Sequence, residues 1–231
     1  MLHRMQDRGE RIRVKLLMSA HTLPDAPSRN VMGEIVGSEK PDEVVVFGGH
    51  IDSWDVGRGA MDDGGGVVVA WEAVKLLQRL GLKPRRTIRV VGWTNEENGG
   101  RGGQGYRDAH KAEVDKHVLA IESDGGVFAP YGFGFTGSAS ARETMRGILG
   151  LLEPLKITTL GDSGDTPDLG PVGREGVPTL SLLADLRRYF QVHHTAADTP
   201  DKIRPEELAT AAAAIATVAY IVADLTEPLP R

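Results

Sequence analysis

The sequence predicts a single α/β domain with three layers, α/β/α, around a mixed, mainly parallel central sheet. Short apolar runs of strand length alternate along the chain with longer amphipathic runs of helix length. Acids and histidines directly follow several of the apolar runs. In open α/β sheets, ligands bind beyond the carboxyl ends of the strands. With 231 residues and no visible linker or repeat, residues 1–231 are expected to form one domain.

Composition excludes some classes of function. Lysine plus arginine number 27 against 32 aspartates plus glutamates, a net charge of −5, and the basic residues are spread out. This balance argues against a nucleic-acid partner. The chain has no cysteine, which excludes disulfides and thiolate chemistry. Any bound metal must therefore be held by histidine and carboxylate side chains.

Neither end of the chain predicts a membrane segment. The first residues, MLHRMQDRGERIRV, are charged and lack the apolar core of a signal peptide, so the sequence predicts no particular localisation. The long uncharged run Leu208–Ala223 is alanine-rich and shorter than the ~20 apolar residues that a bilayer requires. We expect it to be a packed helix and expect no membrane partner.

Three strands are predicted near the N-terminus. Arg11–Thr22 alternates charged and apolar residues, as a half-buried or edge strand does. Asn30–Val36 and Glu43–Phe47 follow as a second strand and a buried third strand. Because short turns join the three, we expect them to be antiparallel neighbours.

The later elements alternate between helix and strand. In chain order they are helix Asp63–Leu80, strand Thr87–Trp93, helix Gly102–His110, strand Val118–Ile121, helix Ala139–Leu152, strand Thr179–Leu183 and a terminal helix that opens at Pro205. The segments Leu160–Gly176 and Tyr189–Thr199 have the composition of loops.

Acids and histidines occur just past the apolar runs at several places. They are His50 with Asp52, Asp62 with Asp63, Glu96 with Glu97, Asp124, and His193 with His194. Singly, such residues have simpler explanations, and Asp62 alone would be interpreted as a helix cap. Burying several carboxylates at one sheet edge without cations would be very unfavourable. The set therefore predicts two divalent metal ions, most simply Zn²⁺, with Mn²⁺ or Co²⁺ as alternatives.

Four segments resemble the motifs of one enzyme family. They are GHIDSWDVGRGAMDDGGG, WTNEENGGRGG, IESDGG and HHTAADT. These segments are similar to the motifs of M28 metallopeptidases, which are co-catalytic zinc aminopeptidases and carboxypeptidases, and most of all to the carboxypeptidase Q (plasma glutamate carboxypeptidase) branch of dipeptidases. The resemblance covers about Val31–Leu225, and the motifs occur in the family's order at compatible spacing.

The resemblance implies a zinc-exopeptidase fold and a metal-dependent exopeptidase that hydrolyses short peptides, with dipeptides as the expected substrates. It implies that His50 and Asp124 bind one ion, that Glu97 and His194 bind the other, and that Asp62 bridges both. Glu96 would be the general base, which takes a proton from the attacking water and passes it to the leaving amine. Asp52 would orient His50, and the peptide bond after Asp62 would be cis. Metal ions fit this reaction because they can lower the pKa of bound water to about 7.

Other candidates are less sharply defined by the resemblance. His193 occupies the place of a tyrosine that in many relatives contacts the tetrahedral intermediate, and substrate contact and simple packing both remain open for it. Asp198 is expected to brace either its loop or His194. The remaining candidates for substrate contact are Ser163, Asp165 and Thr166 in one loop and Arg187, Arg188 and Tyr189 in another. A plain turn explains the first loop almost as well, and solvated side chains explain the second.

The beginning of the chain departs from the family. Relatives usually carry more chain before the first strand, so we expect this one to be N-terminally short, with residues 1–30 as a divergent start. Most relatives are secreted or periplasmic, and a homodimer is left open.

Two rival functions are also considered. One is a single-zinc acyltransferase of the glutaminyl-cyclase type, and the other is a non-catalytic binding module. The complete ligand set from His50 to His194 argues against both.

Overall fold

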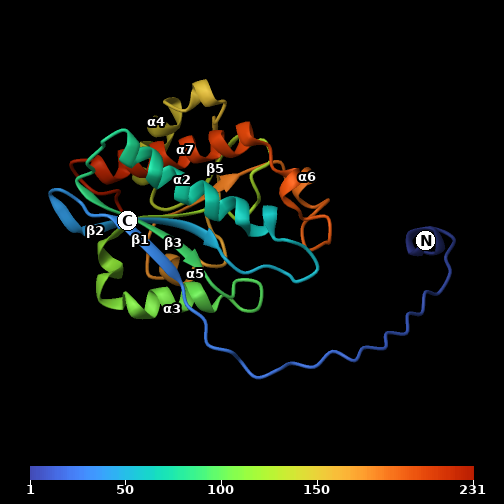
Figure 1. Cartoon of the computed structure of the whole chain (residues 1–231). Helices are drawn as coiled ribbons and strands as arrows, with labels where there is room; N and C mark the ends of the chain where they lie inside the picture. Colours follow the sequence, from blue (N-terminus) through green and yellow to red (C-terminus); the bar gives the residue numbers. More distant parts are fainter.

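A computed structural model describes all residues 1–231. From Val31 onward the chain forms a seven-stranded sheet covered by helices on both faces (Figure 1). The strands are β1 (Val31–Ile35), β2 (Lys40–His50), β3 (Arg86–Trp93), β4 (His117–Glu122), β5 (Gly132–Thr136), β6 (Thr159–Gly161) and β7 (Thr179–Leu183). Their order across the sheet is β1-β3-β2-β4-β7-β5-β6. The four central strands β3, β2, β4 and β7 are parallel to one another. Since β1 and β5 run antiparallel to their neighbours β3 and β7, the predicted mixed, mainly parallel sheet is confirmed.

The helices form two layers. Helices α2 (Gly65–Arg79), α4 (Ala139–Gly150) and α7 (Pro205–Asp224) contribute to the main hydrophobic core on one face of the sheet, whereas α3 (Arg101–Ala109) and α5 (Gly170–Gly173) contribute to a smaller core on the other. Strand β2 shows why both faces are covered. Val45 and Phe47 lie in the main core, and the alternate residues Val44 and Val46 lie in the smaller one. An apolar run on every position of a strand is typical of a strand buried on both sides.

The terminal helix α7 is long and apolar enough to cross a membrane by length and composition alone. Half of its most apolar window is buried inside the domain, where the helix packs against α2. Ala211, Ile215 and Val218 belong to the main core. The predicted packed helix is therefore confirmed.

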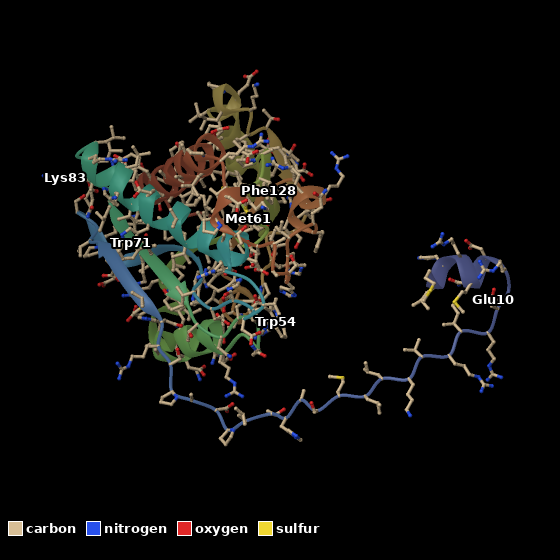
Figure 2. All side chains as sticks on the ribbon, turned by 45° about the vertical axis from the view of Figure 1, so that its right-hand side comes forward. Glu10, Trp54, Met61, Trp71, Lys83 and Phe128 are labelled. Carbon is tan, nitrogen blue, oxygen red and sulfur yellow. The ribbon has the colours of Figure 1, made fainter.

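The predicted strand at Arg11–Thr22 is wrong. After α1 (Leu2–Asp7), residues 10–30 form no helix or strand, and the segment runs away from the domain with Glu10 near its outer end (Figure 2). Val14 and Leu17 are exposed. An alternating pattern becomes a strand only where a partner supplies the ladder hydrogen bonds, and this segment has none.

Strand pairing also differs from the prediction near the N-terminus. β1 and β2 are not neighbours, because β3 lies between them and pairs with both. The predicted loop Leu160–Gly176 contains the end of β6 and the short helix α5, and β5 was not predicted. β5 reads GFGFT, and its two glycines weaken the strand pattern. The short helix α6 (Leu186–Tyr189) leads into the loop that carries His193 and His194.

Candidate metal centre

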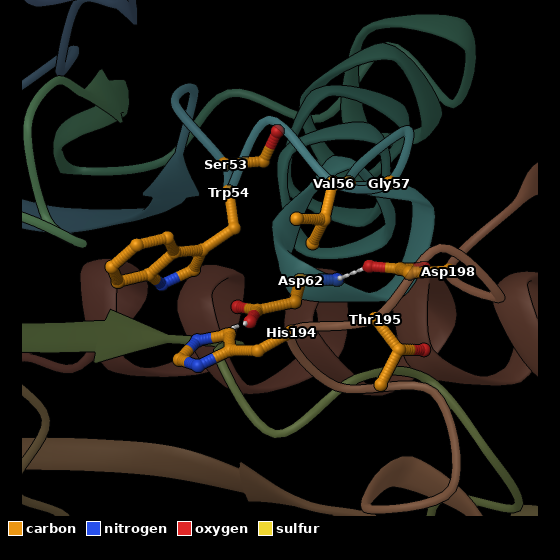
Figure 3. Close-up of a pocket in the computed structure, with 9 residues that line it drawn as sticks. Ser53, Trp54, Val56, Gly57, Asp62, His194, Thr195 and Asp198 are labelled. Carbon is orange, nitrogen blue, oxygen red and sulfur yellow. Dashed lines mark hydrogen bonds and ion pairs between the residues drawn. The ribbon is translucent and has the colours of Figure 1, made fainter. Parts of the chain in front are cut away.

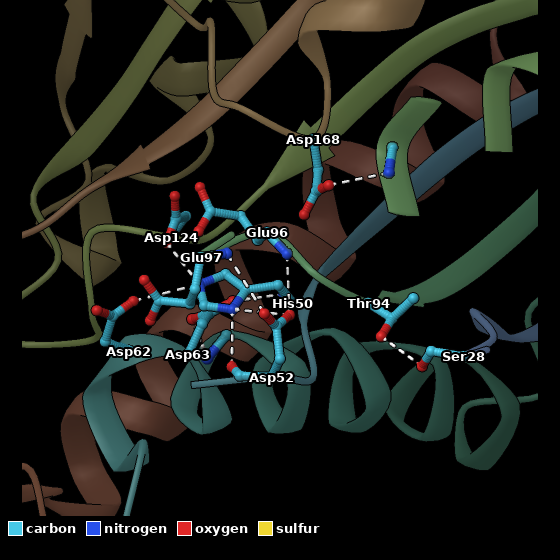
Figure 4. A network of polar contacts seen from close by, with 12 residues as sticks. Ser28, His50, Asp52, Asp62, Asp63, Thr94, Glu96, Glu97, Asp124 and Asp168 are labelled. Atoms are coloured by element: carbon cyan, nitrogen blue, oxygen red, sulfur yellow. Dashed lines mark hydrogen bonds and ion pairs between the residues drawn. The ribbon is translucent and has the colours of Figure 1, made fainter. Parts of the chain in front are cut away.

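The parallel strands bring the predicted residues to one edge of the sheet. β2 ends at His50, Glu96 and Glu97 follow β3 closely, and Asp124 follows β4. Since β2 is the parallel neighbour of both β3 and β4, the carboxyl ends of these strands lie side by side. Figure 4 shows the resulting cluster of side chains at the start of α2.

Asp62 lies between the two halves of the cluster. Its Oδ1 atom is 3.2 Å from His50 Nε2, and its Oδ2 atom is 3.1 Å from His194 Nε2. The peptide bond between Asp62 and Asp63 is cis, as the resemblance implied. The Asp198 carboxylate accepts hydrogen bonds from the backbone N–H groups of Met61, at 2.7 Å, and Asp62, at 3.2 Å. Asp198 therefore braces the Asp62 turn.

Each half of the cluster has a further carboxylate. Asp124 Oδ1 is 3.1 Å from His50 Nε2, and Glu97 Oε2 is 3.0 Å from His194 Nε2. The ligand atoms of His50, Asp62 and Asp124 are close enough to one another to hold a metal ion. His193 stacks on His194, and its Nε2 is 3.4 Å from Asp62 Oδ2, so His193 is also within reach of a metal.

Asp52 contacts His50, as predicted, but through its backbone and not through its carboxylate. His50 Nδ1 lies 2.9 Å from the backbone carbonyl oxygen of Asp52, whereas the nearer carboxylate oxygen is 3.8 Å away. The carboxylate instead accepts the backbone N–H groups of Glu96, at 3.0 Å, and Glu97, at 3.3 Å. Asp52 thus orients His50 through its main chain and holds the Glu96–Glu97 backbone through its side chain.

Sequence reasoning assigned no role to Asp63, which joins β2 to α2. Its Oδ2 atom accepts the backbone N–H of His50, and its Oδ1 atom accepts the N–H of Gly66, both at 3.0 Å. A Cβ atom on Gly49 would lie 2.2 Å from Asp63 Oδ2, and one on Gly66 would lie 2.0 Å from the Ser123 carbonyl oxygen. Both glycines therefore leave space for this carboxylate. The glycines that directly follow the second aspartate in DDGGG, residues 62–66, are the sequence signal that could have revealed the role of Asp63.

Burial and mutual repulsion shift the titration of the cluster. Burial lowers the pKa of His50, but hydrogen bonds to Asp124 and Asp62 outweigh it and raise the pKa far above the usual value. Burial, and then the Asp124 charge, raise the pKa of Glu96 to about 7. Burial and the neighbouring Asp62 also raise the pKa of Glu97. Such shifts mark carboxylates that lack enough positive charge nearby.

The donor atoms of the cluster fit divalent metal ions. Asp62 Oδ2 is buried and accepts no hydrogen bond, although His194 Nε2 is only 3.1 Å away. Glu97 Oε1 is likewise buried without a partner. Buried carboxylate oxygens without a hydrogen-bond partner, close to imidazole nitrogens, are explained by a bound cation. Imidazole and carboxylate together suit zinc and related metals.

The candidates for substrate contact are more scattered. Tyr189 is buried and lies 4.8 Å from His193, ring centre to ring centre. Ser163 and Asp165 hydrogen-bond to each other, and Asp165 also accepts a hydrogen bond from Thr179 on β7, so neither joins the cluster directly. The other candidates in the same two loops also lie outside the cluster. Thr166 donates a hydrogen bond to the buried Glu122. Arg188 forms an ion pair with Glu207, and the Arg187 side chain is exposed.

Known proteins with similar sequences place this chain in a family. A sequence model of Peptidase family M28 matches residues 30–219. The whole chain is 49% identical to carboxypeptidase Q of Bos taurus and 47% identical to carboxypeptidase Q of Homo sapiens. In both cases it covers 49% of the relative. The chain therefore spans about half the length of these curated relatives.

Solved structures agree with the sequence comparison. The crystal structure of a peptidase M28 precursor from Shewanella amazonensis superposes with a TM-score of 0.83 at 41% identity, over 87% of this chain and 46% of that one. The zinc aminopeptidase BSAP from Bacillus subtilis superposes with a TM-score of 0.70 over 87% of this chain and 53% of that one, and at 19% identity it supports the fold alone. By its sequence and its fold, the chain belongs to peptidase family M28.

Proposed function

We propose that this chain carries the catalytic centre of a two-metal exopeptidase that hydrolyses short peptides, with dipeptides as the preferred substrates. The observation that carries the proposal is the position of Asp62. Its two carboxylate oxygens face two different histidines, at 3.2 Å and 3.1 Å. A carboxylate placed in this way can bridge two ions, one held with His50 and Asp124 and the other with His194 and Glu97.

The chemistry divides between the ions and the protein. Two divalent ions, when bound, would acidify a water molecule and polarise the scissile carbonyl group. Glu96 directly precedes Glu97 but is assigned to neither ion, which leaves its carboxylate free to move a proton. Its pKa of about 7 suits a general base near neutral pH. In this role Glu96 takes a proton from the attacking water and delivers it to the leaving amine nitrogen.

Other residues would position these groups. Asp52 holds the backbone of both Glu96 and Glu97. His193 lies beside Asp62 with about a quarter of its side chain exposed, so its ring can reach a substrate that enters from solvent. We propose that His193 donates a hydrogen bond to the developing oxyanion. Tyr189 packs against His193 and would support it.

The decisive experiment combines Glu96→Gln with metal analysis. The variant should retain two ions per chain while hydrolysis of a dipeptide panel falls by about 10²–10⁴-fold, the usual contribution of a general base. Glu72→Gln, at an exposed position of α2 paired with Lys75, is the matched control and should retain full activity. Normal hydrolysis by Glu96→Gln would contradict the assigned role.

The metal count separates the proposal from its rivals. One ion per chain, without hydrolysis of any peptide in the panel, would favour the single-zinc acyltransferase. No bound ion and no hydrolysis would favour a binding module. Because relatives named carboxypeptidases and aminopeptidases share this fold, the panel should include N-acetylated and C-amidated dipeptides. Loss of hydrolysis on blocking one end identifies the terminus that the enzyme recognises.

A further inference from the structure

The two histidines of the centre are held in different ways. His50 is fully buried, and its Nδ1 atom is fixed by the backbone carbonyl of Asp52 at 2.9 Å. His194 has 40% of its side chain exposed, and no hydrogen bond fixes its Nδ1 atom. Metal-binding histidines are normally oriented by a hydrogen bond from the second ring nitrogen. His194 must therefore be oriented by something else.

Aromatic contacts take the place of that hydrogen bond. The His193 ring stacks on His194 with the ring centres 3.5 Å apart, and the Trp54 indole lies 5.4 Å away at an angle of 52°. The backbone of His194 has a φ of +57°, in the left-handed region that residues other than glycine adopt uncommonly. Ring packing thus restricts the rotation of a ligand side chain whose second ring nitrogen has no hydrogen-bond partner.

Trp54 lies beside His194, and its ring contacts no other histidine of the centre. It lies in the loop between β2 and α2 and lines a small pocket with Asp62, His194 and Thr195 (Figure 3). Nevertheless 42% of Trp54 is exposed, so it is not an ordinary core residue.

We propose that Trp54 is a positioning residue that keeps His194 Nε2 directed at Glu97 and Asp62, and that it thereby sets the affinity of one ion. This ion, the His194 ion, is the one that His194, Glu97 and Asp62 would hold. The inference rests on the two-metal centre of the proposed function. The His50 ion has a ligand that is buried and hydrogen-bonded, so its affinity should not depend on Trp54.

The test measures zinc per chain across a series of buffered free-zinc concentrations. The full chain should bind two ions, and Trp54→Ala should weaken one of them by about 10–100-fold, the usual effect of losing a group that orients a metal ligand. The other ion should bind with unchanged affinity. Trp54→Phe, which keeps an aromatic face, should recover most of the loss. Trp71→Ala removes an equally exposed tryptophan from α2 and is the matched control.

Each result has a separate meaning. Retention of both ions at unchanged affinity by Trp54→Ala overturns the inference and leaves the proposed function standing. Equal weakening of both ions also overturns it, because Trp54 would then act on the whole centre. If the unmodified chain binds no second ion, the proposed function itself fails. Selective weakening of one ion in Trp54→Ala, with recovery in Trp54→Phe, supports the inference, because a general loss of stability would not affect one ion alone.

Discussion

The Asp52 carboxylate accepts the backbone N–H of Glu96 in a 3.0 Å hydrogen bond. The second carboxylate oxygen accepts the N–H of Glu97 at 3.3 Å. The proposed base and a proposed metal ligand are therefore held by one side chain on the loop after β2. The backbone carbonyl of Asp52 orients His50 in addition. A single residue thus sets the relative positions of three members of the centre.

Asp52→Asn should lower kcat by about 10–100-fold with little change in KM, because Glu96 and Glu97 shift while the substrate contacts remain. An amide has one oxygen, so one of the two backbone N–H groups loses its acceptor, at a cost of about 1–3 kcal/mol. Steady-state kinetics and urea unfolding measure the two effects. Asp42→Asn, which removes an exposed ion pair with Lys116, should change neither quantity. Unaltered kcat in Asp52→Asn would refute the positioning role.

Removing metal should destabilise the protein, because the clustered carboxylates then repel one another without compensation. Free zinc at about 100 times its dissociation constant should restore about 2.7 kcal/mol for each site. Thermal unfolding after chelation and then zinc addition measures the change. Glu96→Gln should respond as the unmodified chain does, whereas Asp62→Asn should respond far less, since it lacks the shared ligand. An identical zinc response in Asp62→Asn would contradict the bridging role of Asp62.

Gly66→Ala should strongly destabilise the fold. Its Cβ atom would lie 2.0 Å from the Ser123 carbonyl oxygen and 2.3 Å from Asp63 Oδ1, so α2 must move away from the segment that follows β4. Overpacking of this kind costs about 1–3 kcal/mol or more. Gly147→Ala is the matched control: it lies on the exposed face of α4 with open space around it and should stabilise the helix by about 0.5–1 kcal/mol. Equal unfolding free energies for the two variants would show that the close approach is not required.

His117 should make the fold sensitive to mild acid. It is fully buried, with Nε2 2.7 Å from the Tyr106 hydroxyl group, and burial lowers its pKa to about 4. The unfolded chain has an ordinary histidine pKa near 6.5, so between about pH 4 and pH 6.5 His117 is protonated in the unfolded chain and neutral in the folded chain. The contribution of His117 to stability is complete above about pH 6.5 and is lost as the pH falls towards 4. The loss between pH 7 and pH 5 should be about 2 kcal/mol.

The comparison is between urea unfolding at pH 7 and at pH 5. His117→Gln cannot titrate, so its unfolding free energy should fall by about 2 kcal/mol less over that interval than the free energy of the unmodified chain. His21→Gln, in the exposed N-terminal segment, should leave the slope unchanged. Parallel curves for His117→Gln and the unmodified chain would show that His117 is not the titrating group.

Local patterns were sufficient to predict most helices and strands. The apolar runs of β2 and β3 and the periodicity of α2 and α7 lie within a few residues of their predicted positions. Long-range pairing was not predictable in the same way. β3 lies between β1 and β2 because it pairs with both, and Arg11–Thr22 finds no partner strand. An alternating pattern shows that a segment can form a strand. The strand forms only where another segment of the chain lies beside it and pairs with it.

The sequence by itself determined which chemical groups meet at the centre. His50, Glu96, Glu97 and Asp124 follow strands that pack in parallel, and the ends of parallel strands must share one edge. Only the tertiary structure decided what each group contacts. The Asp52 carboxylate holds the Glu96–Glu97 backbone, and no spacing in the sequence could show this, because hydrogen bonds depend on distances between segments far apart in the chain. The residue types that can bind a metal are visible in the sequence itself. The orientation of their side chains is fixed only when the segments that carry them pack together.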